Sequence, residues 1–366
     1  MNAGVPQLRV GMVGAGNISG QYLSTLSRLD DLHLTAVADL DLARAQEVAA
    51  AHGARAMDVQ ELIASESVDV VLNLTIPRAH AEVALSAIAA GKGVYTEKPL
   101  AATVAEGRSM VEAARSAGVV IGGAPDTVLG TGVQTAREVI DSGRIGVPLS
   151  ATATMIIPGH ERWHPNPDFY YQPGGGPLLD MGPYYITSLI TLLGSVARVV
   201  GASSALRTER IIGSGPRAGE RLPVNTPSHV AGILIHHSGA ISSVVMSFDG
   251  VATHAKPLEI HGEHGSLTVP DPNNFSGEVQ LNQGTDGWQQ VPVSAGYRHA
   301  ARGYGLADLF WSGAFDGQPG AGRSQGELAL HVLEVMEAVL SAANCGRSVD
   351  IDSHPDRPSP VPLDER

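Results

Sequence analysis

The chain of 366 residues contains a single cysteine, Cys345, so no disulfide can form within it. Such sparse cysteine usage is typical of proteins held in a reducing cytosol. The first ten residues, MNAGVPQLRV, form neither a basic nor an apolar segment, and no uninterrupted apolar run reaches membrane-spanning length. From these absences we expect a cytoplasmic protein with no membrane partner.

Positive charge is also in deficit, with 24 Lys and Arg against 37 Asp and Glu and a net charge of −13. A surface of that sign repels phosphate backbones, and no run of Lys or Arg offers a local basic patch. We therefore expect a small-molecule partner and no nucleic acid. Only 17% of the residues are charged while 43% are apolar, which indicates a globular chain, and its length favours two domains.

The first 125 residues alternate between short β-branched segments and helical patterns. Stretches such as LARAQEVAAAHG have apolar residues at helical spacing and end in glycine, as many helices do. Strands that alternate with helices predict right-handed βαβ units and a doubly wound parallel sheet. The expected strands are residues 8–14, 34–39, 68–75, 93–97 and 119–123.

After residue 148 the pattern changes to strand segments that follow one another with turn glycines between them. Helical stretches interrupt them at residues 178–193 and 325–343. This order predicts an α+β domain in which helices cover one face of an open, largely antiparallel sheet.

HERWH, residues 160–164, matches the H-E-x-x-H signature of zinc hydrolases, in which two histidines one helical turn apart bind the metal. The signature requires a helix, but prolines flank these residues on both sides and oppose helical dihedrals. No glutamate that could serve as a third ligand follows until Glu209. We therefore expect no metal.

VGAGNISG, residues 13–20, follows a predicted strand and opens a helical pattern, which is the context of a dinucleotide-binding loop. Glycine at 14 permits a tight turn, and glycine at 16 lets the backbone approach a pyrophosphate at the helix N-terminus. An ordinary glycine turn is the alternative. We assign four loop residues to the cofactor site: Gly14, Gly16, Asn17 and Ile18.

Asp39 lies nineteen residues after Gly20 at the end of the second predicted strand, where an acid accepts hydrogen bonds from the adenosine ribose. A 2′-phosphate within about 4 Å of this carboxylate would cost several kcal/mol at an effective dielectric of about 20. The sequence therefore favours NAD over NADP. A helix cap is the alternative role for Asp39.

TEKP, residues 96–99, ends another predicted parallel strand, at the edge where open α/β sheets bind ligands. There Lys98 would be a fixed cation beside the nicotinamide, able to polarise a substrate hydroxyl or ketone oxygen. We assign Glu97 and Lys98, together with Thr75 at the end of the preceding strand, to the cofactor site. A lysine on an ordinary surface is the alternative.

GGGPLLDMGPYY, residues 174–185, spaces Asp180 and Tyr184 four apart, so a helix would bring both to one face. Pro183 either kinks that helix or marks the first turn of a new one. Tyrosine is a poor base at neutral pH, but a neighbouring ammonium lowers its pKa, and Lys98 is the candidate for that charge.

Together, G-x-G-x-x-S, E-K-P and G-G-G-x-L-x-D-x-G resemble the Gfo/Idh/MocA family, that of glucose-fructose oxidoreductase and inositol dehydrogenase, over about residues 8–350. The resemblance implies a Rossmann domain and an α+β domain whose open sheet mediates a homodimer or homotetramer. Pro125 and Asp126 replace the family's usual Asn-Arg, so no specific substrate is assigned. The expected parts are the Rossmann domain (1–125), the α+β domain for substrate and oligomer contacts (126–353) and a Pro-rich tail (354–366).

By motif position, the resemblance implies that Lys98 and Asp180 are catalytic. It also implies hydride transfer between NAD(P) and a hydroxyl or keto carbon of a sugar, polyol or glycoside. Many members carry histidine where this chain has Tyr184, whereas the branch of glucose-fructose oxidoreductase carries tyrosine. We therefore expect Tyr184 to take the hydroxyl proton, assisted by Lys98 and oriented by Asp180, while the hydride passes to the nicotinamide.

On this reading HERWH is a substrate loop, in which Trp163 offers an apolar face to a sugar ring, and polar contacts to its hydroxyls come from His160, Glu161 and His164. Structural packing of the loop is the alternative. Other functions remain open: a glycoside-cleaving hydrolase or lyase with tightly bound NAD, an NAD-responsive binding protein, or a zinc hydrolase. The expected substrate-site residues are Lys98, His160, Trp163, His164, Asp180 and Tyr184.

Overall fold

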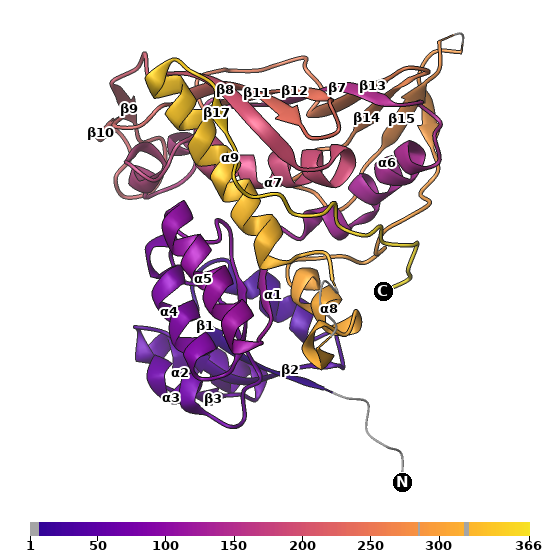
Figure 1. Cartoon of the computed structure of the whole chain (residues 1–366). Coiled ribbons are helices and arrows are strands. Elements are labelled where there is room, and N and C mark those ends of the chain that lie inside the picture. Colours follow the sequence, from indigo (N-terminus) through magenta and orange to yellow (C-terminus); the bar gives the residue numbers. More distant parts are fainter. Residues whose placement is uncertain (1–6, 285, 318–321) are drawn as a thin grey trace. The chain divides into compact units, whose positions relative to one another are not determined.

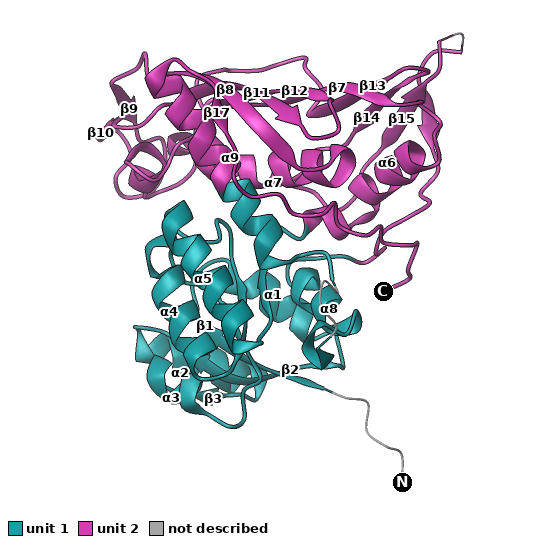
Figure 2. Ribbon diagram, in the orientation of Figure 1, with its two compact units in different colours: residues 1–126, 300–333 teal, residues 127–299, 334–366 magenta. Residues whose placement is uncertain are grey.

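The computed structural model describes residues 7–284, 286–317 and 322–366. Contacts divide the chain into two units, of which unit 1 comprises Met1–Asp126 and Ala300–Leu333 (Figure 2). Unit 2 comprises Thr127–His299 and Glu334–Arg366. The division differs from the sequence-based boundaries, because a segment far along the chain returns to the N-terminal unit.

Unit 1 is built on a six-stranded parallel sheet with the order β3-β2-β1-β4-β5-β6. This is the doubly wound Rossmann order, which reverses between β1 and β4, where such sheets bind dinucleotides. The five predicted strands are confirmed, and β3, only two residues long, was not predicted. The strands are β1 (Leu8–Val13), β2 (Leu32–Ala38), β3 (Arg55–Ala56), β4 (Val70–Asn73), β5 (Gly93–Thr96) and β6 (Ile121–Gly123).

Local sequence signals account for the ends of several helices in unit 1. The Asp41 side chain accepts two backbone N–H groups at the start of α2, and Gly53, with φ of 69°, ends that helix in the left-handed region. Thr103 and Glu106 form a capping box at the start of α5. The helices are α1 (Ser19–Leu26), α2 (Leu42–His52), α3 (Val59–Ala64), α4 (Pro77–Ala89) and α5 (Val104–Ala117).

Helix α8 (Tyr304–Trp311) completes the core of unit 1, although the sequence analysis did not predict it. Leu306 and Leu309 are buried among side chains of β1, β2 and β4. Gly122 permits this approach, because a Cβ there would lie 2.4 Å from the Leu309 side chain. Trp311 Nε1 donates a hydrogen bond to Asp31 Oδ2 at 2.6 Å. Long-range packing thus decides the place of α8.

Unit 2 contains a nine-stranded sheet with the order β16-β15-β14-β13-β7-β12-β11-β8-β17. Among the described strands of this sheet, only β7 and β12 pair in parallel, so the prediction of a largely antiparallel sheet is confirmed. The strands are β7 (Pro148–Ile156), β8 (Val196–Ser204), β11 (His229–His236), β12 (Ile241–Ser247), β13 (Leu258–Gly262), β14 (Ser266–Val269), β15 (Val279–Asn282), β16 (Gln289–Val291) and β17 (Val349–Asp350). A separate hairpin consists of β9 (Glu209–Ile211) and β10 (Arg221–Pro223).

Three helices lie along one face of the nine-stranded sheet: α6 (Thr131–Asp141), α7 (Pro177–Leu193) and α9 (Gly326–Cys345) (Figure 1). Gly201 in β8 lets α9 approach closely, because a Cβ there would lie 2.1 Å from the backbone oxygen of Val339. By length and composition α9 could span a membrane, but 67% of that stretch is buried inside the structure. Packing therefore accounts for the apolar composition of α9.

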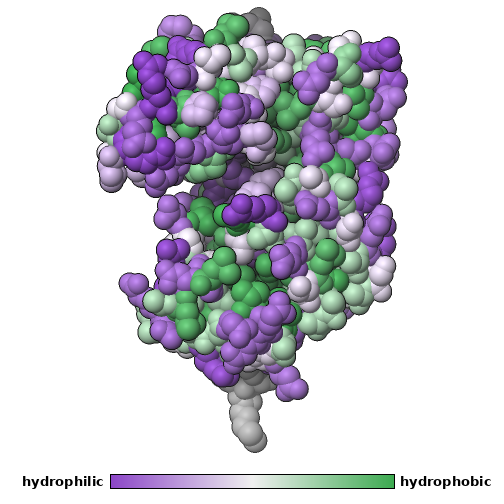
Figure 3. Space-filling view, turned by 90° about the vertical axis from the view of Figure 1, so that its left-hand side faces the viewer, coloured by the Kyte–Doolittle hydropathy of each residue, from purple (hydrophilic) through white to green (hydrophobic). Residues whose placement is uncertain are grey.

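On the face of the molecule drawn in Figure 3, hydrophilic and hydrophobic residues are intermixed.

The residues after 353, expected as a Pro-rich tail, pack against unit 2. Val361 is buried, and its N–H donates to Gln134 Oε1 at 2.9 Å. The Arg357 guanidinium donates to Asp141 Oδ1 at 2.6 Å and to the backbone oxygen of Thr191 at 2.7 Å. The prolines of this segment have no N–H to donate, but Arg357 and Val361 donate hydrogen bonds to acceptors within unit 2. The segment is therefore held in place.

Candidate functional site

The glycine loop between β1 and α1 has the geometry that a dinucleotide requires. Gly14 has φ of 99°, and a Cβ there would lie 2.7 Å from the backbone carbonyl of Leu74. Beyond the chain neighbours, no heavy atom of the described residues lies within 4 Å of the position that a Cβ on Gly16 would take. Ser19 Oγ donates to Gly16 O at 2.7 Å and fixes the turn. This open space before the N-terminus of α1, with Asn17 exposed beside it, suits the predicted diphosphate site.

Asp39, directly after β2, holds the glycine loop and leaves acceptor capacity on its carboxylate. Its Oδ2 accepts the Ala15 N–H at 2.7 Å, and its Oδ1 accepts the Asp41 N–H at 2.8 Å. A carboxylate has about four acceptor positions, so further hydrogen bonds from ribose hydroxyls can be accepted. Arg44 pairs with Asp41 at 3.7 Å, and the helix cap is likewise Asp41. This arrangement suits NAD.

Asp39→Ala should weaken NADH binding by roughly 10- to 100-fold and reduce the preference for NADH over NADPH. Each hydrogen bond to the charged carboxylate contributes about 1.5–3 kcal/mol, and its loss also removes the repulsion of a 2′-phosphate. Fluorescence titration with NADH and NADPH measures both effects without a substrate. The control is Asp41→Ala, which removes the cap of α2 and should leave the coenzyme preference unchanged. An unaltered NADH/NADPH ratio in Asp39→Ala would contradict the assignment.

Lys98 stands on a turn that is fixed by buried hydrogen bonds at the end of β5. Glu97 is buried, and its Oε2 accepts the Lys98 N–H at 2.7 Å. Its Oε1 accepts the Tyr22 hydroxyl at 2.8 Å. Burial, together with the nearby Glu97 carboxylate, raises the pKa of Tyr22 well above its ordinary value, so Tyr22 remains a neutral donor. These contacts show that Glu97 supports the lysine turn, and its assignment to the cofactor site stays a prediction.

A buried histidine that the sequence analysis did not single out connects the turns after β4 and β5. His80 is fully buried, and its ring nitrogens lie 2.8 Å from Pro99 O and 3.0 Å from Thr75 O. Burial lowers the pKa of His80. Thr75 Oγ1 also donates to Asn73 Oδ1 at 2.7 Å. The His80 imidazole therefore lies between the turns after β4 and β5. No sequence motif could have indicated this contact.

Asp126, which replaces part of the family's usual Asn-Arg, supports the start of α8. It is fully buried, and its Oδ2 accepts the N–H groups of Gly303 at 2.7 Å and Gly305 at 3.1 Å. Burial raises the pKa of Asp126. This departure from the family pattern is explained within unit 1 by a helix end that needs an acceptor.

In unit 2, α7 runs without interruption from Pro177 to Leu193 and contains Pro183, so Asp180 and Tyr184 lie one turn apart on one face. Tyr184 is buried. The glycine-rich turn before α7 packs closely against another segment, because a Cβ on Gly175 would lie 2.2 Å from the backbone oxygen of Phe169.

HERWH forms a single 3-10 turn (His160–Arg162), and its polar residues have separate partners. Glu161 is buried, accepts the Tyr171 hydroxyl and pairs with Arg210 Nη1 at 3.1 Å. His160 Nε2 lies 3.0 Å from Asp180 Oδ2, whereas His164 Nδ1 accepts the Asn166 N–H at 3.1 Å. Breaking a buried ion pair costs about 3–5 kcal/mol, so Glu161 is a structural anchor. Within the described residues, no group of three or more His, Cys, Asp or Glu side chains is arranged to hold a metal ion.

Aromatic rings extend from this turn to the surface. The His160 ring centroid lies 4.3 Å from Tyr170, 4.8 Å from Phe248 and 5.3 Å from Trp163. Trp163 and Phe169 are 59% and 56% exposed, which makes both available to a ligand. Exposed rings of this kind can stack on the apolar faces of sugars.

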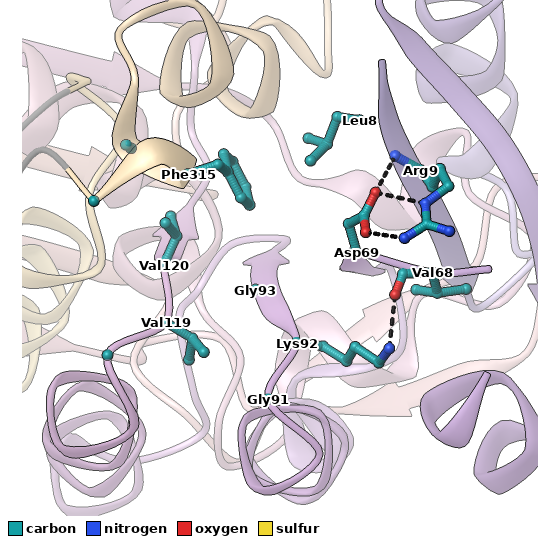
Figure 4. Close-up of a pocket in the computed structure, with 13 residues that line it drawn as sticks. Leu8, Arg9, Val68, Asp69, Gly91, Lys92, Gly93, Val119, Val120 and Phe315 are labelled. Carbon is teal, nitrogen blue, oxygen red and sulfur yellow. Dashed lines mark hydrogen bonds and ion pairs between the residues drawn. The ribbon is translucent and has the colours of Figure 1, made fainter. Parts of the chain in front are cut away.

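A cavity of about 430 Å³ lies in unit 1 where the parallel strands begin, at the edge opposite the glycine loop (Figure 4). Its charged residues have partners: Arg9 Nη2 pairs with Asp69 Oδ1 at 2.5 Å, and Lys92 Nζ donates to Val68 O at 2.8 Å. Because dinucleotides bind at the carboxyl ends of such strands, this cavity is separate from the cofactor site.

Comparison with known families agrees with both units. The model described as the oxidoreductase family with an NAD-binding Rossmann fold matches residues 8–123, and the Gfo/Idh/MocA C-terminal domain matches residues 133–268. A trans-1,2-dihydrobenzene-1,2-diol dehydrogenase from Mus musculus is 35% identical over 295 residues, 78% of this chain and 74% of that protein. The chain belongs to the Gfo/Idh/MocA family of oxidoreductases.

Other Gfo/Idh/MocA proteins match over nearly the whole chain. A 1,5-anhydro-D-fructose reductase from Ensifer adhaerens is 28% identical over 352 residues, 94% of this chain and 99% of that protein. A crystal structure of an NAD binding oxidoreductase from Klebsiella pneumoniae aligns with a TM-score of 0.81 and 25% identity, over 94% of this chain and 99% of that one. The predicted family, fold class and NAD cofactor are therefore confirmed. The roles of individual site residues stay predictions.

Proposed function

We propose that this Gfo/Idh/MocA oxidoreductase transfers a hydride between NAD and a hydroxyl- or keto-bearing carbon of a sugar, polyol or glycoside. The observation that carries the proposal is the pair Asp180 and Tyr184 on one face of α7, since a carboxylate and a phenol can together bind and deprotonate a hydroxyl. The names of the reductase and the diol dehydrogenase above, which refer to a sugar derivative and a diol, support this class of substrate.

In the oxidation direction, Tyr184 as the phenolate accepts the proton of the substrate hydroxyl and becomes a neutral phenol. The Lys98 ammonium stabilises the phenolate before the transfer and the negative charge that develops on the substrate oxygen. Asp180 orients the hydroxyl and the phenol. NAD, when bound, supplies the hydride acceptor for the carbon that bears this hydroxyl. Lys98 belongs to unit 1, and Asp180 and Tyr184 belong to unit 2. Trp163 and His164 would contact the rest of the substrate, whereas the His160 imidazole, expected as a third contact, is only 12% exposed and lies against Asp180.

We further propose that the uncovered face of the nine-stranded sheet joins copies of this chain into a homodimer or homotetramer. Val200, Ile233 and Ile241 on β8, β11 and β12 are 43%, 39% and 49% exposed. Ile233 pairs with Val200, and Ile241 pairs with Ile235, which points to the same face as Ile233. An apolar surface shared by three strands suits contact with a second copy of the chain. The location of the protein in the cytoplasm remains a separate prediction.

The experiment that tests the proposed activity is a panel of sugars, inositols and glycosides with NAD, together with keto sugars and NADH, followed by NADH absorbance. At least one cyclic alcohol or its ketone should give net turnover. Glycoside cleavage without net change in NADH would favour the glycoside-cleaving alternative. Absence of any turnover, in protein that binds NADH, would contradict the proposal.

A further inference from the structure

The His160 imidazole is held against Asp180 by its surroundings in unit 2. The distance between His160 Nε2 and Asp180 Oδ2 is 3.0 Å, and the two side chains are only 12% and 18% exposed. Tyr170 packs against one side of the imidazole and Phe248 against another, with centroid distances of 4.3 and 4.8 Å. Packing on several sides restricts rotation of the ring, so its orientation toward Asp180 is fixed.

The backbone that carries His160 is fixed as well. Gly159 has φ of 101°, and a Cβ there would lie 2.2 Å from Glu161 Oε2, so this position requires glycine. Glu161 pairs with Arg210, whose side chain is 2% exposed and which also pairs with Asp249. The turn is therefore anchored on both sides of His160 by contacts that do not involve the imidazole.

Hydrogen bonding identifies the ring nitrogen that carries the proton. Nδ1 of His160 is buried and has no hydrogen-bond partner among the described residues, whereas Nε2 faces the Asp180 carboxylate. A proton on Nδ1 would leave a buried donor unsatisfied, which is unfavourable. The tautomer with the proton on Nε2 donates to Asp180 and leaves Nδ1 as an acceptor, whereas the other tautomer would turn the Nε2 lone pair toward the carboxylate.

We propose that His160 is a positioning residue for the reaction, a neutral donor that holds the Asp180 carboxylate in the orientation that serves Tyr184 and the substrate hydroxyl. It acts through Asp180 and does not itself remove the proton, because its unprotonated nitrogen is enclosed. HERWH, which resembles a zinc motif, thereby supplies an anchor at its glutamate and a donor at its first histidine. The inference rests on the proposed function above.

Two substitutions separate a hydrogen-bonding role from a packing role. His160→Ala should lower kcat roughly 10- to 100-fold, because a small misplacement of a catalytic group has effects of that size, with the KM for NAD unchanged. His160→Gln places an amide N–H near the former Nε2 and should restore kcat to within a few-fold of the parent. The matched control is His254→Ala, an exposed histidine of unit 2, with unchanged kcat expected. Equal, low kcat in His160→Ala and His160→Gln, or parental kcat in both, would overturn the proposal.

A second measurement needs no turnover and therefore separates this inference from the proposed function. Nitrogen-15 NMR of histidine-labelled enzyme, with the His160 signals assigned from their loss in His160→Gln, reports which ring nitrogen carries the proton. We expect the Nε2–H tautomer at neutral pH. A proton on Nδ1 would overturn the donor role even in an enzyme with full activity, whereas the expected tautomer without any turnover would leave only the proposed function contradicted.

Discussion

Lys98→Ala should lower kcat by roughly 10²- to 10³-fold in both directions of the reaction, the loss expected when a donor to a developing oxyanion is removed. The dissociation constant of NADH should change little, because we expect the glycine loop and Asp39 to provide the contacts with the diphosphate and ribose. The turn should also survive, since alanine keeps the N–H that donates to Glu97 Oε2 at 2.7 Å. Steady-state kinetics and NADH titration on the same preparation measure the two effects.

The matched control is Lys256→Ala, which removes an exposed lysine of unit 2 and should leave kcat unchanged. Parental turnover in Lys98→Ala would remove this lysine from the mechanism. An equal loss in NADH affinity and in kcat/KM would instead make Lys98 a cofactor ligand alone. Rapid unfolding of Lys98→Ala is not expected, because the Tyr22 to Glu97 hydrogen bond does not involve the lysine side chain.

The fold of unit 1 could largely be predicted because its signals are local. The strands are compact apolar segments, and the glycine loop follows a strand and opens a helix within eight residues. Helix α8 escaped prediction because it is short, and its place depends on Gly122, Leu309 and Asp31, which lie far apart in the sequence. The C-terminal residues were expected as a tail for a similar reason, since the acceptor of the Val361 N–H, Gln134, lies 227 residues away.

In the candidate site, the residue types could be predicted from the sequence, whereas their contact partners could not. Sequence motifs could indicate that Lys98, Asp180 and His160 carry useful chemistry. They could not indicate partners, because Glu97 pairs with Tyr22 across 75 residues and Glu161 with Arg210 across 49. Hydrogen bonds of this separation depend on tertiary packing. The sequence indicated that HERWH is unsuited to a helix, but it could not predict the contact between His160 and Asp180.

Tyr184→Phe should lower kcat by roughly 10²- to 10⁴-fold, the usual contribution of a general acid–base group, with little change in the KM for NAD. Phenylalanine preserves the ring, and Tyr184 is buried in a continuous helix, so unfolding free energy should fall by only about 1 kcal/mol for the lost hydroxyl contact. Kinetics and urea unfolding measure these quantities separately.

The neighbouring Tyr185 provides the matched control for the loss of a phenol. Its hydroxyl donates to Asp271 Oδ1 at 3.2 Å, and burial, with the Asp271 carboxylate, raises the pKa of Tyr185 far above its ordinary value. Tyr185 is therefore unsuited to act as a base, and Tyr185→Phe should cost a buried hydrogen bond while kcat is retained. Parental kcat in Tyr184→Phe would place the base elsewhere, with His164 the next candidate.

The double variant Lys98→Ala/Tyr184→Phe tests whether the two residues act on the same proton. Independent residues would multiply their effects, whereas residues that act as one unit are strongly non-additive. We expect the loss in the double variant to be clearly smaller than the product of the two single losses, because one of the two groups that the ammonium stabilises, the phenolate, is already gone while the substrate oxygen remains. Multiplied losses would mean that the lysine and the tyrosine serve separate steps, and the proposal that Lys98 and Tyr184 act in one proton transfer would fail.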